Sequence, residues 1–529
     1  MTNRPIADTA RQILPCIGFS MLAGFVSAVI ITLFKLCAEA VIRLSANIYG
    51  AVRSDPVWLP LLVLGAAVIG FGASFLYGLS RNCRGGGIPS SVAAIRGILS
   101  FRWWACLIIL PISALMSFLC GMPLGTEGPC VQLGTSIGDG VIQCCAPKKH
   151  KGWRRYIMTG GASAGFSIAA SSPLTAIIFA MEELHNHFSP LIMTVASVSV
   201  ITAQATVQVL SRLGIGSVGL FHITEMELID AKMLFIPVVI GIACGIGSML
   251  FTRLYQQVNR LMRYLIGKVS VKILFPILFA CICIIGFLLA DSLGTGHSLT
   301  DVLLENGRVW YMIILVFLIR ALTMMISNTA GVTGGIFLPT ICFGALLGAL
   351  CGKAMLALGI IGEEHFILAV VLGIASFLGA TSHIPVTACI FAVETLGCFS
   401  NALSVMIAVT LAYMTVELFG IEDFTETVIN AKIESAKDGK SATVVDVPLT
   451  VSEGAFVIGK EMRDILWPSS CFVVSIKRSD APRHHHQIAV GDVITLHYKT
   501  YNPYATATEL KMLMGEQSSE VRSLMIPKP

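Results

Sequence analysis

The sequence predicts an all-α protein that crosses a membrane many times, followed by a small α/β domain near the C-terminus. Three observations support this prediction: an apolar composition, a series of long apolar segments and an internal repeat. Of the 529 residues, 55% are hydrophobic and 13% are charged, and the mean hydropathy is +0.80. Soluble domains contain about 25% charged residues, so the composition excludes a soluble protein.

Apolar segments of about 20 residues, the length that crosses a bilayer as a helix, recur between residues 13 and 435. They cover residues 13–35, 57–79, 104–121, 188–210, 232–251, 271–290, 308–326, 364–380 and 401–419. Shorter apolar pieces, interrupted by glycine and proline, lie between them at 88–100, 129–143, 160–181, 336–352 and 385–398. Pieces too short to span are typical of broken or re-entrant helices, which line a cavity or are buried in protein.

The segments that flank the membrane domain are polar. Residues 1–12 are expected to form a short cytoplasmic lead-in without a signal peptide, 436–445 a linker and 521–529 a tail. The basic residues lie mostly in short loops between the apolar segments. The positive-inside rule therefore assigns these loops, and with them both termini, to the cytoplasm.

Two features of the composition limit the possible partners. The net charge of +5 does not indicate a nucleic-acid partner, because the basic residues lie in the short loops. The sixteen cysteines fall mostly in apolar segments without metal-ligand spacing. We therefore expect them to pack as small hydrophobic residues, with no disulfide framework and no metal site.

An internal repeat divides the membrane domain into halves of about 13–225 and 230–435. The twelve residues from Pro173 match the twelve from Pro385 at eight positions, at an offset of 212 residues. At an offset of 210 residues, Gly125, Pro129, Gly134 and Gly138 correspond to Gly335, Pro339, Gly344 and Gly348. In that register Glu127 lies opposite Phe337. Internal repeats, commonly inverted, are typical of transporters that hold a substrate between helix ends near the bilayer midplane.

Three glycine-rich stretches, 85–89, 125–129 and 334–339, are predicted to start helices inside the membrane. Each combines glycine, which lets backbone approach a ligand closely, with a proline suited to the first turn of a helix. The free amides and the helix dipole make such a start an anion site without a basic side chain. Each stretch alone is better explained by helix packing, but three together favour weak, multi-site anion binding, which conduction requires.

Four glutamates near these motifs are candidates for function. An ionisable residue within a membrane is costly and is usually functional. Because Glu127 is itself an anion, it can occupy the site of the substrate and leave it when protonated, so we interpret it as a gate and proton carrier. Glu182 and Glu183 form a second acidic pair, in which Glu182 fits an ordinary solvated helix end equally well. Glu394, the repeat partner of Glu182, is expected to be a structural hydrogen-bonding residue.

The order of these motifs around Pro173 and Pro385 resembles the CLC family of chloride channels and proton-coupled chloride exchangers, over about residues 13–435. The resemblance implies an inverted-repeat fold of about eighteen partly broken helices and a homodimer with one pore per subunit. By motif, Glu127 matches the external gating glutamate, and Glu183 matches the inner glutamate that passes protons in exchangers. The implied anion-binding residues are Gly86, Gly87, Ile88, Gly128, Ile336, Phe337 and Phe424.

The chain departs from the family pattern at three positions. Gly86 stands where serine is frequent, and counting from Gly420 places Phe424 where the family often has a tyrosine. Both changes remove a hydroxyl donor, which implies an anion held mainly by backbone amides, weakly and with looser selectivity. Thr126 stands where a basic residue is common, which would weaken the attraction of anions to the outer mouth.

Residues 446–520 are predicted to form a cytoplasmic regulatory domain. Strands are expected within 444–449, 471–476 and 488–498, and helices at 459–465 and 505–514. The stretch 466–478 and the pair Gly491-Asp492 resemble the C-terminal domain of potassium-uptake regulators (the TrkA C-terminal type), which implies sensing of an unknown small ligand. His484-His485-His486 is interpreted as an exposed turn rather than a metal site.

The leading hypothesis is exchange of chloride for protons, with Glu127 and Glu183 handling the protons. The alternative within the same fold is a passive chloride channel gated by voltage or pH. A cation transporter or a membrane-embedded enzyme is a third hypothesis, which the scarcity of convergent carboxylates, nucleophiles and metal ligands in the sequence disfavours. The expected partners are chloride or another small monovalent anion, protons and a second copy of the chain, with no cofactor and no nucleic acid.

Overall fold

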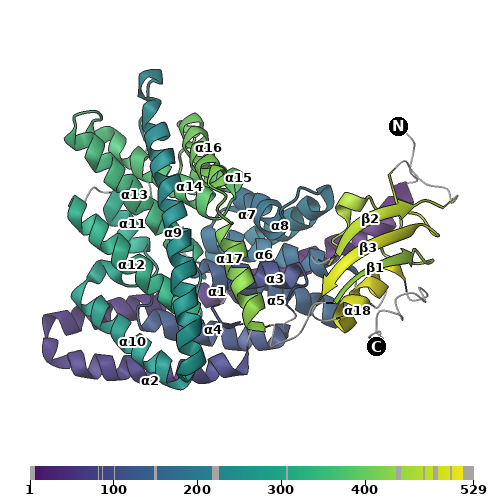
Figure 1. The fold of residues 1–529 in the computed structure, drawn as a ribbon, viewed down its shortest axis with the longest axis horizontal. Coiled ribbons are helices and arrows are strands. Elements are labelled where there is room, and N and C mark those ends of the chain that lie inside the picture. The colour runs from purple at the N-terminus through teal and green to yellow at the C-terminus, as the bar shows by residue number, and fades with distance from the viewer. Residues whose placement is uncertain are drawn as a thin grey trace.

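The computed structural model describes residues 6–80, 83–85, 87–99, 102–147, 152–216, 226–304, 308–436, 443–468, 471–479, 486–500 and 503–515. These ranges contain eighteen α-helices and one three-stranded sheet. The helices form the body of the molecule, and the sheet lies at one end of it (Figure 1). The predicted fold class is therefore confirmed.

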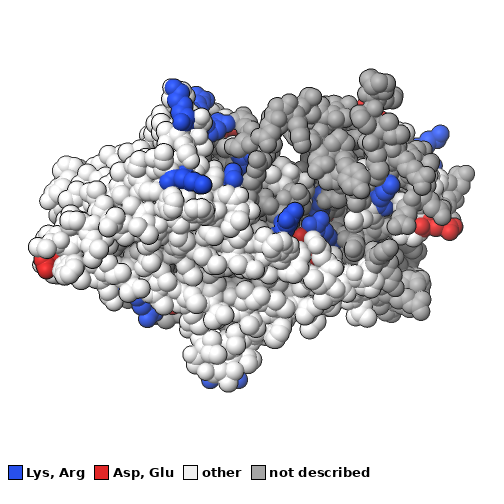
Figure 2. All heavy atoms as spheres, turned by 90° about the horizontal axis from the view of Figure 1, so that it is seen from below, with Lys and Arg blue, Asp and Glu red and all other residues white. Residues whose placement is uncertain are grey.

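Each of the nine predicted membrane-spanning segments contains a helix. These are α1 (Ile6–Ser54), α2 (Leu59–Leu79), α4 (Trp103–Leu119), α8 (Pro190–Arg212), α9 (Phe235–Lys268), α10 (Val271–Leu288), α12 (Trp310–Ala330), α14 (Phe366–Thr381) and α16 (Ala402–Leu418). Among the described residues, eight helices are long and apolar enough to cross a membrane. Large apolar side chains such as Leu61, Leu64 and Val68 of α2 are exposed, and the left part of the face in Figure 2 is mostly uncharged, apart from basic groups along its upper edge and a few single charged residues. Such a surface fits contact with lipid.

Six other helices are mostly buried among these. They are α3 (Ile88–Ile95), α5 (Glu127–Cys145), α6 (Arg154–Ala170), α7 (Pro173–Phe179), α13 (Phe337–Ala357) and α15 (Pro385–Glu394). The prediction that 336–352 is too short to span is wrong, because α13 has 21 residues and is apolar enough to cross a membrane. The piece predicted at 160–181 is broken, as its glycine and proline residues indicated. The chain turns between α6 and α7, where Ser171 has a φ of 55° and Pro173 starts the next helix. Two further helices, α11 (His297–Leu304) and α17 (Phe424–Ala436), were not predicted.

The two repeat halves pack in the same way. α5 packs on α6 as α13 packs on α14, and α1 packs on α8 as α9 packs on α16. Gly125 and Gly335, matched by the sequence repeat, exchange two backbone hydrogen bonds of 2.7 Å in an antiparallel bridge. Residues at equivalent positions in the two halves can each donate a backbone hydrogen bond to the other when a two-fold axis relates the halves. The inverted repeat is therefore confirmed.

The C-terminal sheet has the order β1-β3-β2 and is antiparallel throughout. Its strands are β1 (Thr443–Thr450), β2 (Cys471–Lys477) and β3 (Val493–Thr500), and the helix α18 (Pro503–Met514) follows them. Leu449, Ile494, Leu496 and Leu510 are buried in a core separate from that of the membrane helices. This small α/β unit agrees with the predicted architecture.

Several predicted boundaries differ from the structure. α1 and α9 continue to Ser54 and Lys268, well beyond the predicted ends at residues 35 and 251. The helix expected at 459–465 is only a 3-10 turn, Met462–Asp464, because Gly459 adopts a φ of 74°. β1 starts at Thr443, before the predicted domain start at residue 446. α1 starts at Ile6, so polar residues of the expected lead-in continue the first helix. His484 and His485 lie outside the described residues.

Candidate functional site

The starts of α3, α5 and α13 meet at glycines in backbone contact. A Cβ added to Gly128 would lie 2.6 Å from Cα of Gly335, and a Cβ added to Gly87 would lie 3.0 Å from Cα of Gly128. Any side chain at these positions would push the helix starts apart, because backbone atoms cannot rotate out of the way. The three glycine-rich stretches therefore converge, as their sequence predicts.

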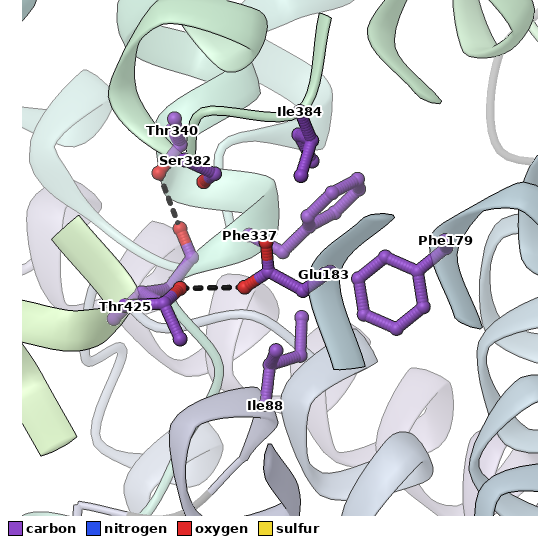
Figure 3. Close-up of a pocket in the computed structure, with 9 residues that line it drawn as sticks. Ile88, Phe179, Glu183, Phe337, Thr340, Ser382, Ile384 and Thr425 are labelled. Atoms are coloured by element: carbon purple, nitrogen blue, oxygen red, sulfur yellow. Dashed lines mark hydrogen bonds between the residues drawn. The ribbon is translucent and has the colours of Figure 1, made fainter. Parts of the chain in front are cut away.

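A small cavity lies beside this junction (Figure 3). Its lining residues come from the starts of α3 and α13, the α14–α15 connection, the end of α7, the turn that follows α7 and the first turn of α17. They are Ile88, Phe179, Glu183, Ile336, Phe337, Thr340, Ser382, Ile384 and Thr425. The cavity leaves about 10 Å³ for the centre of a water-sized particle, which is room for about one water molecule or small ion.

Glu183 points into this cavity from a π-helical turn, Ala180–Leu184, that directly follows α7. The hydroxyl of Thr425 donates a 2.6 Å hydrogen bond to Oε1 of Glu183. The Arg96 guanidinium donates to the carbonyls of Glu183 and Leu184, at 3.3 Å and 3.2 Å, and forms an ion pair with Glu426. π-helical turns are rare and are frequent at functional sites. Hydrogen bonds therefore hold both the backbone and the side chain of Glu183.

Glu127 starts α5 and is completely buried. Its Oε1 accepts a 3.1 Å hydrogen bond from the Thr126 hydroxyl, whereas Oε2 has no hydrogen-bond partner among the described residues. The side chain folds back over Gly125, since a Cβ on that glycine would lie 2.6 Å from Oε2. Glu127 is not among the residues that line the cavity. Of the two predicted proton-handling carboxyl groups, Glu183 therefore lines the cavity, whereas Glu127 lies outside it, over Gly125.

The other predicted anion-binding residues differ in where they lie and in whether their amides are free to bind an anion. Ile88, Ile336 and Phe337 line the cavity, and Gly128 lies in the junction. The amide of Gly87 is already used, because it donates a 2.7 Å hydrogen bond to Oε1 of Gln132. Gly86 lies outside the described residues.

Phe424 occupies the first position of α17, but its ring lies outside the cavity lining. It packs edge-on against Tyr255, with ring centroids 4.6 Å apart, and against Phe251 at 5.5 Å. The next residue, Thr425, faces the cavity instead. The hydroxyl group that is missing at Phe424 is thus present on the next residue, Thr425. It donates a hydrogen bond to Glu183. Neither Thr425 nor Gln132 was identified from the sequence.

Glu182 and Glu394 cap each other's repeat-related helices. Glu182 Oε1 accepts from the amide of Val386 at 3.0 Å, and Oε2 accepts from the amide and hydroxyl of Thr387, both at 2.7 Å. In the other half, Glu394 accepts from the amides of Leu174 and Thr175 at 2.8 Å. Carboxylates at helix starts satisfy amides that have no intrahelical partner. Glu182 therefore has the structural hydrogen-bonding role that was expected for Glu394, rather than lying at an ordinary solvated helix end.

Glu182→Ala is therefore expected to lower stability without removing proton coupling. Loss of a helix cap costs about 0.5–2 kcal/mol, which should lower the midpoint of thermal unfolding of the purified protein. Glu394→Ala should lower it by a similar amount, and Glu422→Ala, at an exposed residue, should leave it unchanged. An unchanged midpoint for both capping variants would contradict the structural role.

Comparison with known proteins identifies the family. The sequence model of the family described as "Voltage gated chloride channel" matches residues 65–417, well over half of the chain. The H(+)/Cl(-) exchange transporter ClcA of Citrobacter koseri is 24% identical over 405 residues, which cover 76% of this chain and 84% of ClcA.

Solved structures agree in fold. A slow cyanobacterial Cl-/H+ antiporter matches with a TM-score of 0.71 and 20% identity, over 80% of this chain and 99% of that one. A CLC-type fluoride/proton antiporter matches with a TM-score of 0.64 and 20% identity, over 78% and 96% of the two chains. The convergent helix starts, the inverted repeat and these matches together show that the chain belongs to the CLC family of voltage gated chloride channels.

Proposed function

We propose that this protein exchanges chloride for protons across a membrane, through the glycine junction of α3, α5 and α13 and the cavity beside it. The observation that carries the proposal is a pair of buried carboxyl groups, Glu127 at the start of α5 in the glycine junction and Glu183 in the cavity beside it. A passive anion path has no need of two such costly groups. The relative ClcA is named an exchange transporter and the cyanobacterial neighbour an antiporter, which supports the same activity here.

Chloride is bound by backbone amides rather than by a basic side chain. The first-turn amides of a helix have no intrahelical acceptor, and the dipole adds partial positive charge. The amides of Gly128, Ile336 and Phe337 belong to such turns. Partial charges attract an anion without trapping it, so the anion can leave again.

Glu127 acts as the external gate and proton acceptor. Its ionised carboxylate competes with chloride for the same amides, and protonation removes that attraction and lets the side chain leave. Oε2, which accepts no hydrogen bond from the part of the chain that the structure describes, is the atom that takes up the proton. Glu183 transfers the proton on the inner side, where the Thr425 hydroxyl fixes the orientation of its carboxyl group.

The passive chloride channel remains the second candidate within the same fold. In both cases the expected assembly is a homodimer with one pore per subunit, with both termini and the C-terminal domain in the cytoplasm.

Reversal potentials separate the two candidates. Purified protein in liposomes is placed under a fixed chloride gradient while the pH gradient is varied, and empty liposomes serve as the control. An exchanger should shift its reversal potential with the pH gradient, because each cycle moves protons. A reversal potential that stays at the chloride equilibrium value would contradict exchange and favour the channel. Replacing chloride with fluoride in the same assay tests the choice of anion.

A further inference from the structure

Contacts between the C-terminal domain and the membrane domain concentrate on one segment, residues 456–467. Asp464 makes two of them. Its Oδ1 accepts a 2.8 Å hydrogen bond from the Ser189 hydroxyl, and its backbone carbonyl accepts one from the Tyr156 hydroxyl. The Arg155 guanidinium donates to the carbonyl of Trp467 at 2.8 Å. The segment therefore lies on the starts of α6 and α8, where Figure 1 shows the sheet domain beside the helices.

The membrane side of these contacts is the connection that follows Glu183. Ser189 is the N-cap of α8 and accepts from the amides of Leu191 and Ile192, at 3.2 Å and 3.4 Å. Nε2 of His187 lies 2.8 Å from the carbonyl of Arg463, and the amide of His187 donates to Met181 within the π-helical turn at 3.0 Å. Only a few residues separate Asp464's partner Ser189 from the turn that holds the inner carboxyl group.

The C-terminal domain packs closely against the start of α6. The rings of Trp153 and Phe456 meet edge to face, with centroids 4.9 Å apart, and a Cβ on Gly152 would lie 2.5 Å from the Phe456 ring. Lys460 lies over both rings, at 5.1 Å and 3.7 Å from their centroids. Burial lowers the pKa of Lys460 to about 8, so most of its charge persists at neutral pH and contributes cation–π attraction. The domain thus presents a fixed surface to the start of α6 and to the connection that follows the turn bearing Glu183.

We propose that Asp464 is a positioning residue for proton transfer. Through Ser189, the docked C-terminal domain fixes the connection after Glu183, and so keeps the Glu183 carboxyl group against the Thr425 hydroxyl. Arg96 holds the turn from the other side through the Glu183 and Leu184 carbonyls. Release of the domain lowers proton transfer while the anion path through α3, α5 and α13 persists. This proposal rests on the proposed function, specifically on proton transfer by Glu183.

The test measures proton and chloride fluxes together from liposomes that contain the full-length protein. Asp464→Ala removes the acceptor for Ser189, and loss of one hydrogen bond of about 1 kcal/mol predicts a proton-to-chloride flux ratio about fivefold lower. Asp464→Asn keeps an acceptor oxygen and should restore the ratio. Asp446→Ala is the matched control, because Asp446 is exposed on β1 and pairs with His497 of the same sheet.

The outcomes distinguish positioning from simple structural support. A lower ratio in Asp464→Ala, with wild-type ratios in Asp464→Asn and Asp446→Ala, supports the proposal. An unchanged ratio, or a parallel loss of both fluxes, overturns it. If Asp464→Ala does not fold, Ser189→Ala is judged by the same criteria. Glu183→Gln is measured beside them. If Glu183→Gln still moves protons, the proposed function fails. If Glu183→Gln loses its proton flux while Asp464→Ala keeps the wild-type flux ratio, only the positioning role is refuted.

Discussion

Glu127→Gln is expected to abolish proton transport by the purified protein while chloride flux continues. Glutamine has nearly the shape of the protonated side chain but carries no charge and cannot release a proton. It therefore no longer competes with chloride for the amides at the starts of α5 and α13, and no proton can cross at this point. Proton flux driven by a chloride gradient in liposomes should fall to that of empty liposomes, and the reversal potential should move to the chloride equilibrium value.

Glu39→Gln is the matched control for this substitution. Glu39 makes a helix-surface ion pair with Arg43, four residues along α1, and remains partly exposed. The chemical change is the same but lies away from the glycine junction, so exchange should be unaffected. Proton movement that persists in Glu127→Gln at the wild-type rate would refute the assigned gate.

Features that depend on local composition or on the repeat were predictable from the sequence. The nine long apolar segments all contain helices, because a long apolar run is typical of a membrane helix. Two of them, α4 and α16, have 17 residues and are not among the eight helices long enough to cross a membrane. The pairing of Gly125 with Gly335 follows from their matched positions in the two halves, since a two-fold relation brings equivalent residues together. Glu183 was singled out through the resemblance to the CLC family, and the structure places its side chain in the cavity.

Features that depend on contacts between distant segments were not predictable. Nothing in the sequence indicates that Glu182 would bind amides more than 200 residues away, at Val386 and Thr387. The choice between Phe424 and Thr425 depends on how the first turn of α17 is rotated, and a shift of one residue turns a helix by about 100°. The hydrogen bond from the Gly87 amide to Gln132 was likewise not predictable, because helix packing brings the two residues together and no sequence motif indicates it.

Gly161→Ala is expected to have the largest effect on stability of the substitutions considered. A Cβ at Gly161 would lie 2.1 Å from the carbonyl oxygen of Gly134, and one at Gly134 would lie 2.0 Å from the carbonyl oxygen of Gly161. The obstacle in both cases is backbone of the facing helix, so α5 and α6 can accept the methyl group only by separating. Overpacking in a core costs typically 1–3 kcal/mol, and a clash with backbone should reach the upper end of that range or exceed it.

The measurements are the yield of folded protein and the midpoint of thermal unfolding in detergent. Gly78→Ala is the control, because Gly78 is exposed on α2 with nothing within 4 Å of an added Cβ. The repeat makes the prediction more specific. Gly344 and Gly373 oppose each other in the second half, with added Cβ atoms 2.6 Å and 2.4 Å from the partner's carbonyl oxygen.

Gly373→Ala should therefore resemble Gly161→Ala, with a smaller loss because its contacts are slightly longer. A wild-type midpoint for both variants would mean that the helices can move apart freely, which would contradict close packing of the two halves. Because Glu127 starts α5 and Phe337 starts α13, separation of either helix pair also displaces a helix start of the glycine junction. Any folded fraction of these variants should consequently show weaker proton coupling as well as lower stability.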